Sequence, residues 1–274
     1  MSRLRASAVN ALRWLFGRPA LLPFTATVLR ARTVRPTAAF VARECMGRGG
    51  LFVYRVRYNG LRAAIRHNTG DVVTLGEVFY TNYYQPIREV EHALARVENI
   101  VDLGANVGLF GVFAATRWPE AEILAFEPDP ANAAVHERTI ALNELEERWK
   151  LIRAAAGARE DRVAFVAGGI ALSHLPDVGE DEPTIEVPLE DVLPRLAGAD
   201  LLKMDIEGGE WAILGDPRFR AAPPRALVLE YHPHLCPGPN ARGAAESALE
   251  AAGLCVQSLW HRDDGHGMLW AWRD

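Results

Sequence analysis

The sequence predicts an α/β protein with a Rossmann-like, doubly wound and mostly parallel sheet. From residue 98 onward, apolar runs of strand length alternate with segments of helical periodicity, which is typical of a parallel sheet covered on both faces. The last two expected strands are joined by a turn that is too short for a crossover, so they must be antiparallel. The expected strands are 99–103, 122–127, 150–155, 200–205, 225–230, 254–260 and 268–272, and the expected helices include 131–143, 208–214 and 241–252.

The first part of the chain is expected to form a separate extension. We assign residues 1–85 to an N-terminal extension or cap, and residues 86–274 to the sheet domain. Residues 51–66 alternate in polarity around Asn59-Gly60, a dipeptide that favours a tight turn between two strands. The extension is therefore expected to contain a β-hairpin.

Two more helices are expected outside the alternating region. A short helix is expected near residues 7–16. A second is expected to begin at Pro86, because proline is favoured in the first turn of a helix. This helix would place Val90, Leu94 and Val97 on one buried face.

The composition is that of an ordinary soluble globular enzyme, with 49% hydrophobic and 24% charged residues. The longest apolar stretches have the length of a strand, so no membrane-spanning helix is expected. The N-terminal stretch lacks the apolar core of a secretory signal. Cys45, Cys236 and Cys255 are odd in number and widely spaced, which favours a reducing compartment. We therefore expect the protein in the cytoplasm.

The charge is unevenly distributed along the chain. Residues 1–66 contain thirteen arginines and a single acid, Glu44, whereas the whole chain has a net charge of −5. A basic arm of this kind can bind nucleic acid or an anionic surface. We favour a simpler interpretation, a solvated basic face against the acidic remainder of the chain.

A glycine-rich turn after the first strand predicts a nucleoside-binding site. Asp102 precedes the turn, which contains Gly104 and Gly108, and Glu127 ends the second strand. Dinucleotide-binding turns need glycine at the middle position, where the backbone approaches a pyrophosphate, but this chain has Asn106 there. S-adenosylmethionine has no phosphate, and the turn can receive its carboxylate while Glu127 accepts the ribose hydroxyls. The alternative is a tight turn without a ligand.

Three segments together resemble the FkbM family of class I S-adenosylmethionine-dependent methyltransferases. These are residues 102–108, 126–129 and 202–210, of which the last is the most specific. The resemblance covers about residues 65–232, and it includes a tyrosine-rich lead-in at 71–84. It implies a seven-stranded sheet with a reversed last strand. It also implies O-methylation, typically of hydroxyls on sugars, polyketides or other natural products.

The residues expected to contact the cofactor lie mostly at the ends of the first strands and in the turns that follow them. In open α/β sheets, ligands bind beyond the carboxyl ends of the strands. The expected cofactor-binding residues are Asp102, Gly104, Asn106, Gly108, Glu127, Pro128, Ala155 and Asp205.

The candidate catalytic residues follow the fourth and fifth strands. Asp205 is the first candidate because the acid after the fourth strand normally lies beside the methyl donor. Glu207 either lines the acceptor pocket or acts as a base. His232 has the ordinary pKa best suited to a base near neutral pH, although a histidine held by hydrogen bonds is an equal alternative. Lys203 shares the strand face of Asp205 and could orient the acceptor oxygen. Glu210 is interpreted as a first-turn helix acid.

A divalent cation is a less favoured alternative. Asp205, Glu230 and His232 could bind Mg²⁺ or a similar ion and lower the pKa of the acceptor hydroxyl. The spacing of His232, His234 and Cys236 also suggests zinc, but the prolines among them favour a loop over an aligned strand face.

The leading functional hypothesis is an O-methyltransferase that acts on a small molecule. The alternatives are an RNA methyltransferase that uses the basic arm, and a non-catalytic nucleoside-binding module. The segments expected to shape the acceptor pocket are 70–90 and 168–182, and the latter lies in a loop between two short strands of 160–192. Neither segment identifies the acceptor, and the oligomeric state is not predicted.

Overall fold

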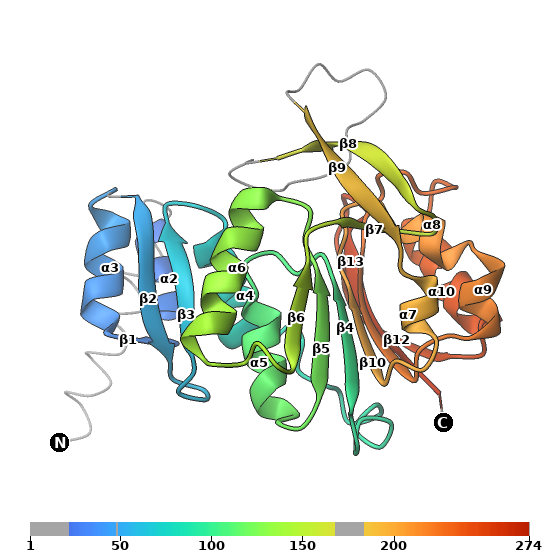
Figure 1. Cartoon of the computed structure of the whole chain (residues 1–274), viewed down its shortest axis with the longest axis horizontal. Coiled ribbons are helices and arrows are strands. Elements are labelled where there is room, and N and C mark those ends of the chain that lie inside the picture. The colour runs from blue at the N-terminus through green and yellow to red at the C-terminus, as the bar shows by residue number, and fades with distance from the viewer. Residues whose placement is uncertain (1–21, 48, 168–183, 274) are drawn as a thin grey trace, which may run out of the picture. The chain divides into compact units, whose positions relative to one another are not determined.

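The computed structural model describes residues 22–47, 49–167 and 184–273, and the chain divides into two compact units between Tyr83 and Tyr84 (Figure 1). The helix expected near 7–16 and the expected pocket segment 168–182 lie outside the described residues. Over the described ranges, every helix is too short or too polar to cross a lipid bilayer.

The first unit contains a three-stranded antiparallel sheet in the order β1-β2-β3. The hairpin expected from Asn59-Gly60 is confirmed, since β2 pairs with β3 and Gly60 has a positive φ of 79°. Phe40, Tyr54 and Ile65 are fully buried in its interior. Its elements are α2 (Leu22–Ala31), β1 (Val34–Arg35), α3 (Thr37–Cys45), β2 (Gly50–Val56), β3 (Arg62–His67) and α4 (Asp71–Phe79).

Several arginines of the basic segment form contacts within this unit. Arg66 pairs with the buried Asp71 through two side-chain hydrogen bonds of 2.8 and 3.0 Å. The guanidinium of Arg43 lies over the ring of Phe52, and Arg57 donates to the carbonyl oxygen of Val34. These arginines thus stabilise the fold of the first unit.

The second unit is built on a seven-stranded sheet in the order β12-β13-β11-β10-β4-β5-β6. All neighbouring strands are parallel except the pairs that β13 forms with β11 and β12. The expected reversed strand in a mostly parallel sheet is therefore confirmed. The strands are β4 (Asn99–Leu103), β5 (Glu122–Phe126), β6 (Trp149–Ile152), β10 (Leu201–Met204), β11 (Ala226–Tyr231), β12 (Cys255–His261) and β13 (Gly267–Trp272).

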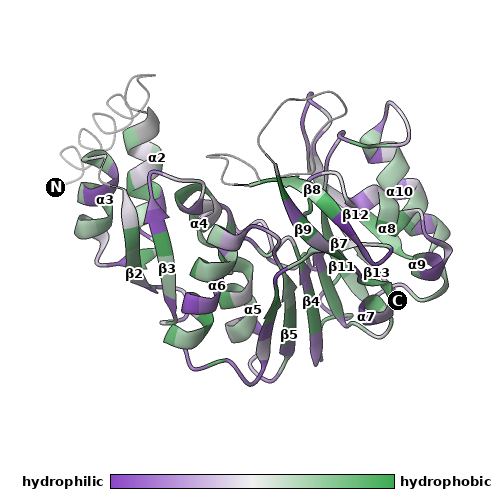
Figure 2. Ribbon diagram, turned by 45° about the horizontal axis from the view of Figure 1, so that its top comes forward, coloured by the Kyte–Doolittle hydropathy of each residue, from purple (hydrophilic) through white to green (hydrophobic). Residues whose placement is uncertain are grey.

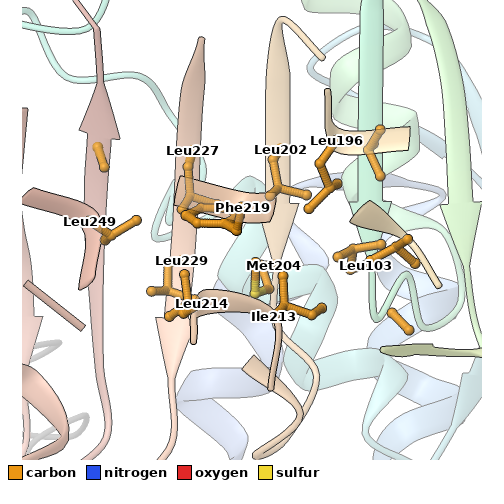
Figure 3. Packing of buried hydrophobic residues seen from close by; sticks show 14 of the residues in the cluster. Leu103, Leu196, Leu202, Met204, Ile213, Leu214, Phe219, Leu227, Leu229 and Leu249 are labelled. Atoms are coloured by element: carbon orange, nitrogen blue, oxygen red, sulfur yellow. The ribbon is translucent and has the colours of Figure 1, made fainter. Parts of the chain in front are cut away.

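Helices cover both faces of this sheet, and its central strands are mostly hydrophobic (Figures 1 and 2). On one face, Leu103, Met204 and Leu229 belong to a hydrophobic cluster with Ile213 and Leu249 from the helices (Figure 3). Because side chains alternate along a strand, Asp102 and Lys203 point to the opposite face. Helices α7 (Leu193–Leu196), α8 (Glu210–Leu214), α9 (Pro217–Ala221) and α10 (Ala241–Ala251) lie on the cluster side, and α5 (Leu109–Arg117) and α6 (Pro130–Leu142) on the other.

The helix ends follow local sequence signals. The Asp129 carboxylate accepts hydrogen bonds from the backbone of Ala131 and Asn132, and Pro130 occupies the first position of α6. Helix α10 is followed by Gly253, which has a φ of 81°. A left-handed residue after the last turn is a common way to end a helix, and glycine adopts it without steric cost.

The helix expected from Pro86 is wrong. Within 86–97, residues 88–94 form turns without a continuous helix. The Val90 amide bonds to the carbonyl oxygen of Ile87, three residues back, and the Leu94 amide bonds to that of Val90, four residues back. Val90, Leu94 and Val97 are nevertheless buried, as expected. A short segment gains little from helical propensity alone, so turns that bury the same side chains can replace the helix.

The third expected strand, 150–155, is divided between two sheets. β6 ends at Ile152, whose carbonyl oxygen accepts a hydrogen bond from the Glu127 amide. The chain then bends, and β7 (Ala155–Gly157) pairs with β9 (Thr184–Asp191). β9 also pairs with β8 (Asp161–Val166), so these strands form a second, three-stranded sheet.

Candidate functional site

The glycine turn after β4 lies directly against the end of β10. Gly104, Asn106 and Gly108 have φ values of 74°, 48° and 84°. Asparagine adopts this left-handed region more readily than most residues, which explains how Asn106 replaces the expected glycine. A Cβ atom on Gly104 would lie 1.7 Å from the carbonyl oxygen of Asp205. Gly104 is therefore needed both for its φ and for the close approach of two chain segments.

Glu127 connects this turn to the end of β5. One carboxylate oxygen accepts from the Asn106 amide at 2.8 Å, and the other accepts from the Asp129 amide at 2.9 Å. Burial raises the pKa of Glu127 to about 7, although these two backbone hydrogen bonds oppose the shift. Pro128, between the two acids, is half-buried. The turn and the acid that were expected to bind a nucleoside are thus joined by hydrogen bonds.

Sequence reasoning missed His136, which lies beneath the turn. Its side chain is fully buried on α6, and a Cβ atom on Gly108 would lie 2.6 Å from its ring. The ring also makes an edge contact with Trp149, with centroids 5.1 Å apart. Burial lowers the pKa of His136 to about 4, so it is neutral near pH 7. This histidine fills the space that glycine leaves open.

Lys203 joins the glycine turn to the acids. Its ammonium donates to the carbonyl oxygens of Gly104 and Leu103, at 2.6 and 3.2 Å. It lies 3.4 Å from a carboxylate oxygen of Asp102 and 3.6 Å from one of Asp205. Burial lowers the pKa of Lys203, but the charges of Asp102 and Asp205 outweigh burial, and the pKa lies above its ordinary value.

Asp102 is a buried carboxylate with incomplete hydrogen bonding. Its side chain is fully buried, and neither oxygen accepts a hydrogen bond from a residue that the structure describes. Burial raises the pKa of Asp102 to about 6, and the charge of Lys203 opposes the shift. The Lys203 ammonium, 3.4 Å away, is the counterion of this carboxylate, which has further lone pairs for a donor on a ligand.

Asp205, Glu207 and His232 converge beyond the ends of β10 and β11, as their positions in the sequence suggested. The His232 Nε2 atom lies 3.2 Å from a Glu207 oxygen and 3.9 Å from an Asp205 oxygen. The Asp205 and Glu207 side chains are 23% and 19% exposed, whereas His232 is 3% exposed. Glu207 has a left-handed φ of 53°, which is rare outside glycine and often marks a functional site.

Glu210 completes this cluster, and sequence reasoning did not assign it there. Its side chain is fully buried, and one oxygen accepts from His232 Nδ1 at 2.7 Å. Burial lowers the pKa of His232, but the hydrogen bond and charge of Glu210, followed by the charges of Glu207 and Asp205, raise it to about 10. His232 is therefore charged at neutral pH, unlike a histidine with its ordinary pKa. No pattern in the sequence connects Glu210 with His232.

The residues that could bind a metal differ from the expected set. Among the described residues, ligand atoms of Asp205, Glu207 and His232 lie within 4.8 Å of one another, so Glu207 takes the place expected for Glu230. The charge of Glu230 instead helps to raise the pKa of Lys203. His234 and Cys236 follow β11 in a loop, as expected.

Ala155 is separated from the main sheet. It opens β7, pairs with Leu189 in the second sheet and is buried. A cavity of about 430 Å³ lies elsewhere, at the amino ends of β4 and β5, where Asn99 and Glu122 line it. Since ligands of open α/β sheets bind at the carboxyl ends, we do not assign this cavity to the site.

Comparison with known proteins identifies relatives of this chain. The family model described as the methyltransferase FkbM domain matches residues 102–247. Methyltransferase sdnD of Sordaria araneosa is 35% identical over 79 residues, which cover 29% of this chain and 28% of that protein. The 31-O-demethyl-FK506 methyltransferase FkbM of Streptomyces tacrolimicus is 30% identical over 168 residues, which cover 48% of this chain and 65% of that protein. The matches thus span less than two thirds of either relative.

Solved structures give a more distant comparison. The O-methyltransferase TomG from Streptomyces achromogenes, solved in complex with S-adenosylmethionine, is 13% identical to this chain, with a TM-score of 0.40. The superposition covers 66% of this chain and 75% of TomG.

Proposed function

The chain belongs to the FkbM methyltransferase family, and we propose that it transfers a methyl group from S-adenosylmethionine to a hydroxyl of a small molecule. The observation that carries the proposal is the contact between two parts of the site. The glycine turn lies against Asp205, and Lys203 bridges the turn to Asp205. A donor bound at the turn would therefore lie beside the acids that could serve the acceptor.

The residues of the turn fit S-adenosylmethionine. Asp102 offers a buried carboxylate to the ammonium of the methionine part. The amides of Gly104, Asn106 and Gly108 already donate within the protein, so we assign the carboxylate of the ligand to the amino end of α5, which begins at Leu109. Glu127 already accepts two amides, but each carboxylate oxygen has a second lone pair for a ribose hydroxyl. S-adenosylmethionine supplies a methyl group activated by a sulfonium, for in-line displacement by the acceptor oxygen. Pro128 would flank the ribose, whereas Ala155 is the weakest of the expected contacts because it lies in the second sheet.

The acceptor hydroxyl must lose a proton, and we assign its removal to Asp205, with Glu207 as the second candidate. Both side chains are partly exposed at the carboxyl ends of the strands. A base at this position accelerates the reaction by about 10²–10⁴-fold. His232 is protonated at neutral pH, because its pKa is about 10, and we propose that it donates a hydrogen bond instead of accepting the proton.

The charge around the site supports a neutral acceptor. Two partly exposed carboxylates would repel a polyanion, whereas they can accept hydrogen bonds from the hydroxyls of a polyol. Arg43, Arg57 and Arg66 of the basic segment are engaged within the first unit. We therefore favour methylation of a sugar or another natural product over RNA methylation as the function.

Calorimetry with S-adenosylmethionine tests the cofactor, and mass spectrometry of hydroxylated acceptors tests the reaction. We expect binding and a mass gain of one methyl group on oxygen. Binding without turnover of any hydroxylated compound would instead favour a non-catalytic nucleoside-binding module.

We expect cofactor affinity to depend on Glu127 ionisation. Its pKa is about 7, and the ribose hydroxyls bind best to the charged carboxylate. The affinity for S-adenosylhomocysteine should fall about 10-fold between about pH 8 and about pH 6, as Glu127 gains a proton. Calorimetry over this range measures the effect. Glu127→Gln should bind weakly at every pH, and an unchanged pH dependence in this variant would contradict the assignment.

We expect turnover to be independent of divalent cations. A metal ion at Asp205, Glu207 and His232 would have to displace a proton from His232, and the raised pKa of this histidine opposes that exchange near neutral pH. The measurement is methyl transfer to an identified acceptor before and after EDTA treatment. Activity that EDTA removes and Mg²⁺ restores would establish the metal-dependent alternative.

A further inference from the structure

A buried carboxylate–imidazole pair lies behind the two partly exposed acids. The Glu210 side chain is fully buried, and His232 is 3% exposed. They are joined at 2.7 Å through Nδ1, while Nε2 faces Glu207 and Asp205. The pair is thus closed to solvent on one side and borders the acids of the proposed site on the other.

The backbone fixes both members of this pair. The two oxygens of Glu210 accept hydrogen bonds from the Ile206 and Gly208 amides, at 3.3 and 2.8 Å, in the turn that carries Glu207. The carbonyl oxygen of His232 accepts from Trp211 Nε1 at 3.1 Å. Glu210 therefore connects the imidazole and the turn of Glu207 through one rigid group. A plain helix-terminal acid would not require full burial or a histidine partner.

We propose that Glu210 is a positioning residue for methyl transfer, which holds His232 as a two-fold hydrogen-bond donor so that Asp205 or Glu207, and not the imidazole, receives the acceptor proton. In this step the O–H bond of the acceptor breaks and a new O–H bond forms on a carboxylate. His232 donates from Nδ1 to Glu210 and from Nε2 toward the two outer acids. This role rests on the proposed function, because it concerns the same site.

The charges around His232 support this role. Glu210 approaches from α8, and Asp205 and Glu207 approach from the turn after β10. From the turn between β12 and β13, the His266 ring lies with its centroid 5.2 Å from that of His232, and His266 is itself 3.0 Å from Asp264. Three carboxylates thus face the His232 ring. Each ring nitrogen lies within hydrogen-bond distance of a carboxylate oxygen, Nδ1 at 2.7 Å and Nε2 at 3.2 Å, and ionised carboxylates only accept, so this geometry favours a hydrogen on both nitrogens.

The experiment is a pH titration of His232 by NMR in the full-length protein with isotope-labelled histidine, with and without S-adenosylhomocysteine. The His232→Asn variant identifies its signals. In the wild type, both ring nitrogens should remain protonated to at least about pH 8. In Glu210→Gln the midpoint should fall by about two pH units or more, since one charge-assisted hydrogen bond is lost. Glu210→Asp keeps the negative charge, so the midpoint of His232 should lie between those of Glu210→Gln and the wild type.

Glu246→Gln is the matched control, because Glu246 is an α10 residue that pairs with Arg242. It should titrate like the wild type. A neutral His232 in the wild type near pH 7, or an unchanged midpoint in Glu210→Gln, would overturn the proposal. If Glu210→Gln fails to fold, the wild type and Glu210→Asp decide. His232 of the wild type must be charged near pH 7, and its titration midpoint in Glu210→Asp must lie below that of the wild type.

Activity gives a second readout once an acceptor is identified. Glu210→Gln should lower kcat about 10²-fold, with little change in KM for S-adenosylmethionine, and Glu210→Asp should recover part of the rate. The NMR titration needs no acceptor. A charged His232 therefore supports the positioning role of Glu210 even if the acceptor group is not a hydroxyl. A neutral His232 contradicts that role even if methyl transfer is confirmed.

Discussion

Replacing Asp205 with asparagine is expected to abolish most methyl transfer, with a fall in kcat of about 10²–10⁴-fold. Asp205 is partly exposed at the end of β10, and Lys203 and His232 lie 3.6 and 3.9 Å from its carboxylate. Asparagine keeps the size of the side chain but cannot accept the proton of the acceptor. The affinity for S-adenosylhomocysteine should change much less than kcat, because the turn and Glu127 are intact. Steady-state kinetics and calorimetry on the same preparation measure both effects.

Asp161→Asn provides the matched control for this variant. Asp161 is an aspartate of β8 whose carboxylate pairs with Arg159 at 3.0 Å. Its loss should leave turnover unchanged, because exposed ion pairs contribute little. Wild-type turnover in Asp205→Asn would move the assignment of the base to Glu207.

Gly104→Ala is expected to cost about 3–5 kcal/mol of folding free energy and to eliminate cofactor binding, because a left-handed alanine is combined with overpacking. Gly104 has a φ of 74°, and the added Cβ atom would lie 1.7 Å from the Asp205 carbonyl oxygen. This neighbour is backbone at the end of β10, so it cannot turn aside as a side chain would. Relief of the clash must separate β4 from β10. Chemical denaturation measures the free energy, and calorimetry measures binding.

Gly198→Ala separates the cost of a left-handed alanine from the cost of the clash with Asp205. Gly198 has a φ of 91°, but apart from its two chain neighbours no described residue lies within 4 Å of the position of its Cβ. This variant should therefore lose only about 1–2 kcal/mol, from the left-handed backbone alone. Equal losses in the two variants would mean that contact with Asp205 contributes nothing.

Much of the fold could be predicted because its signals are local. Strand and helix periodicity, the glycine turn and the short terminal hairpin each occupy a few consecutive residues. The structure confirms the mostly parallel sheet and the reversed β13. The helix expected from Pro86 was wrong because burial of Val90, Leu94 and Val97 does not require a continuous helix.

The inner part of the candidate site could not be predicted, because its contacts join distant residues. His136 fills the space beneath Gly108, and Glu210 bonds to His232 across 22 positions of the chain. A sequence shows that Glu210 is acidic and follows a strand, but not that it is buried. Burial and the partner together decide whether His232 is neutral or charged.

Under the proposed function, the bridge that Lys203 makes also separates donor binding from acceptor choice. Lys203 ties the glycine turn to Asp205 through residues on adjacent strands, although Gly104 is 99 positions away in the chain. The glycine turn and Asp205 therefore form one frame at the carboxyl ends of β4 and β10. In the proposed enzyme, substitutions in the loops that shape the acceptor pocket are expected to alter the acceptor, while the frame keeps the donor and the base in register. Libraries confined to such loops are therefore expected to give new acceptors without loss of S-adenosylmethionine binding.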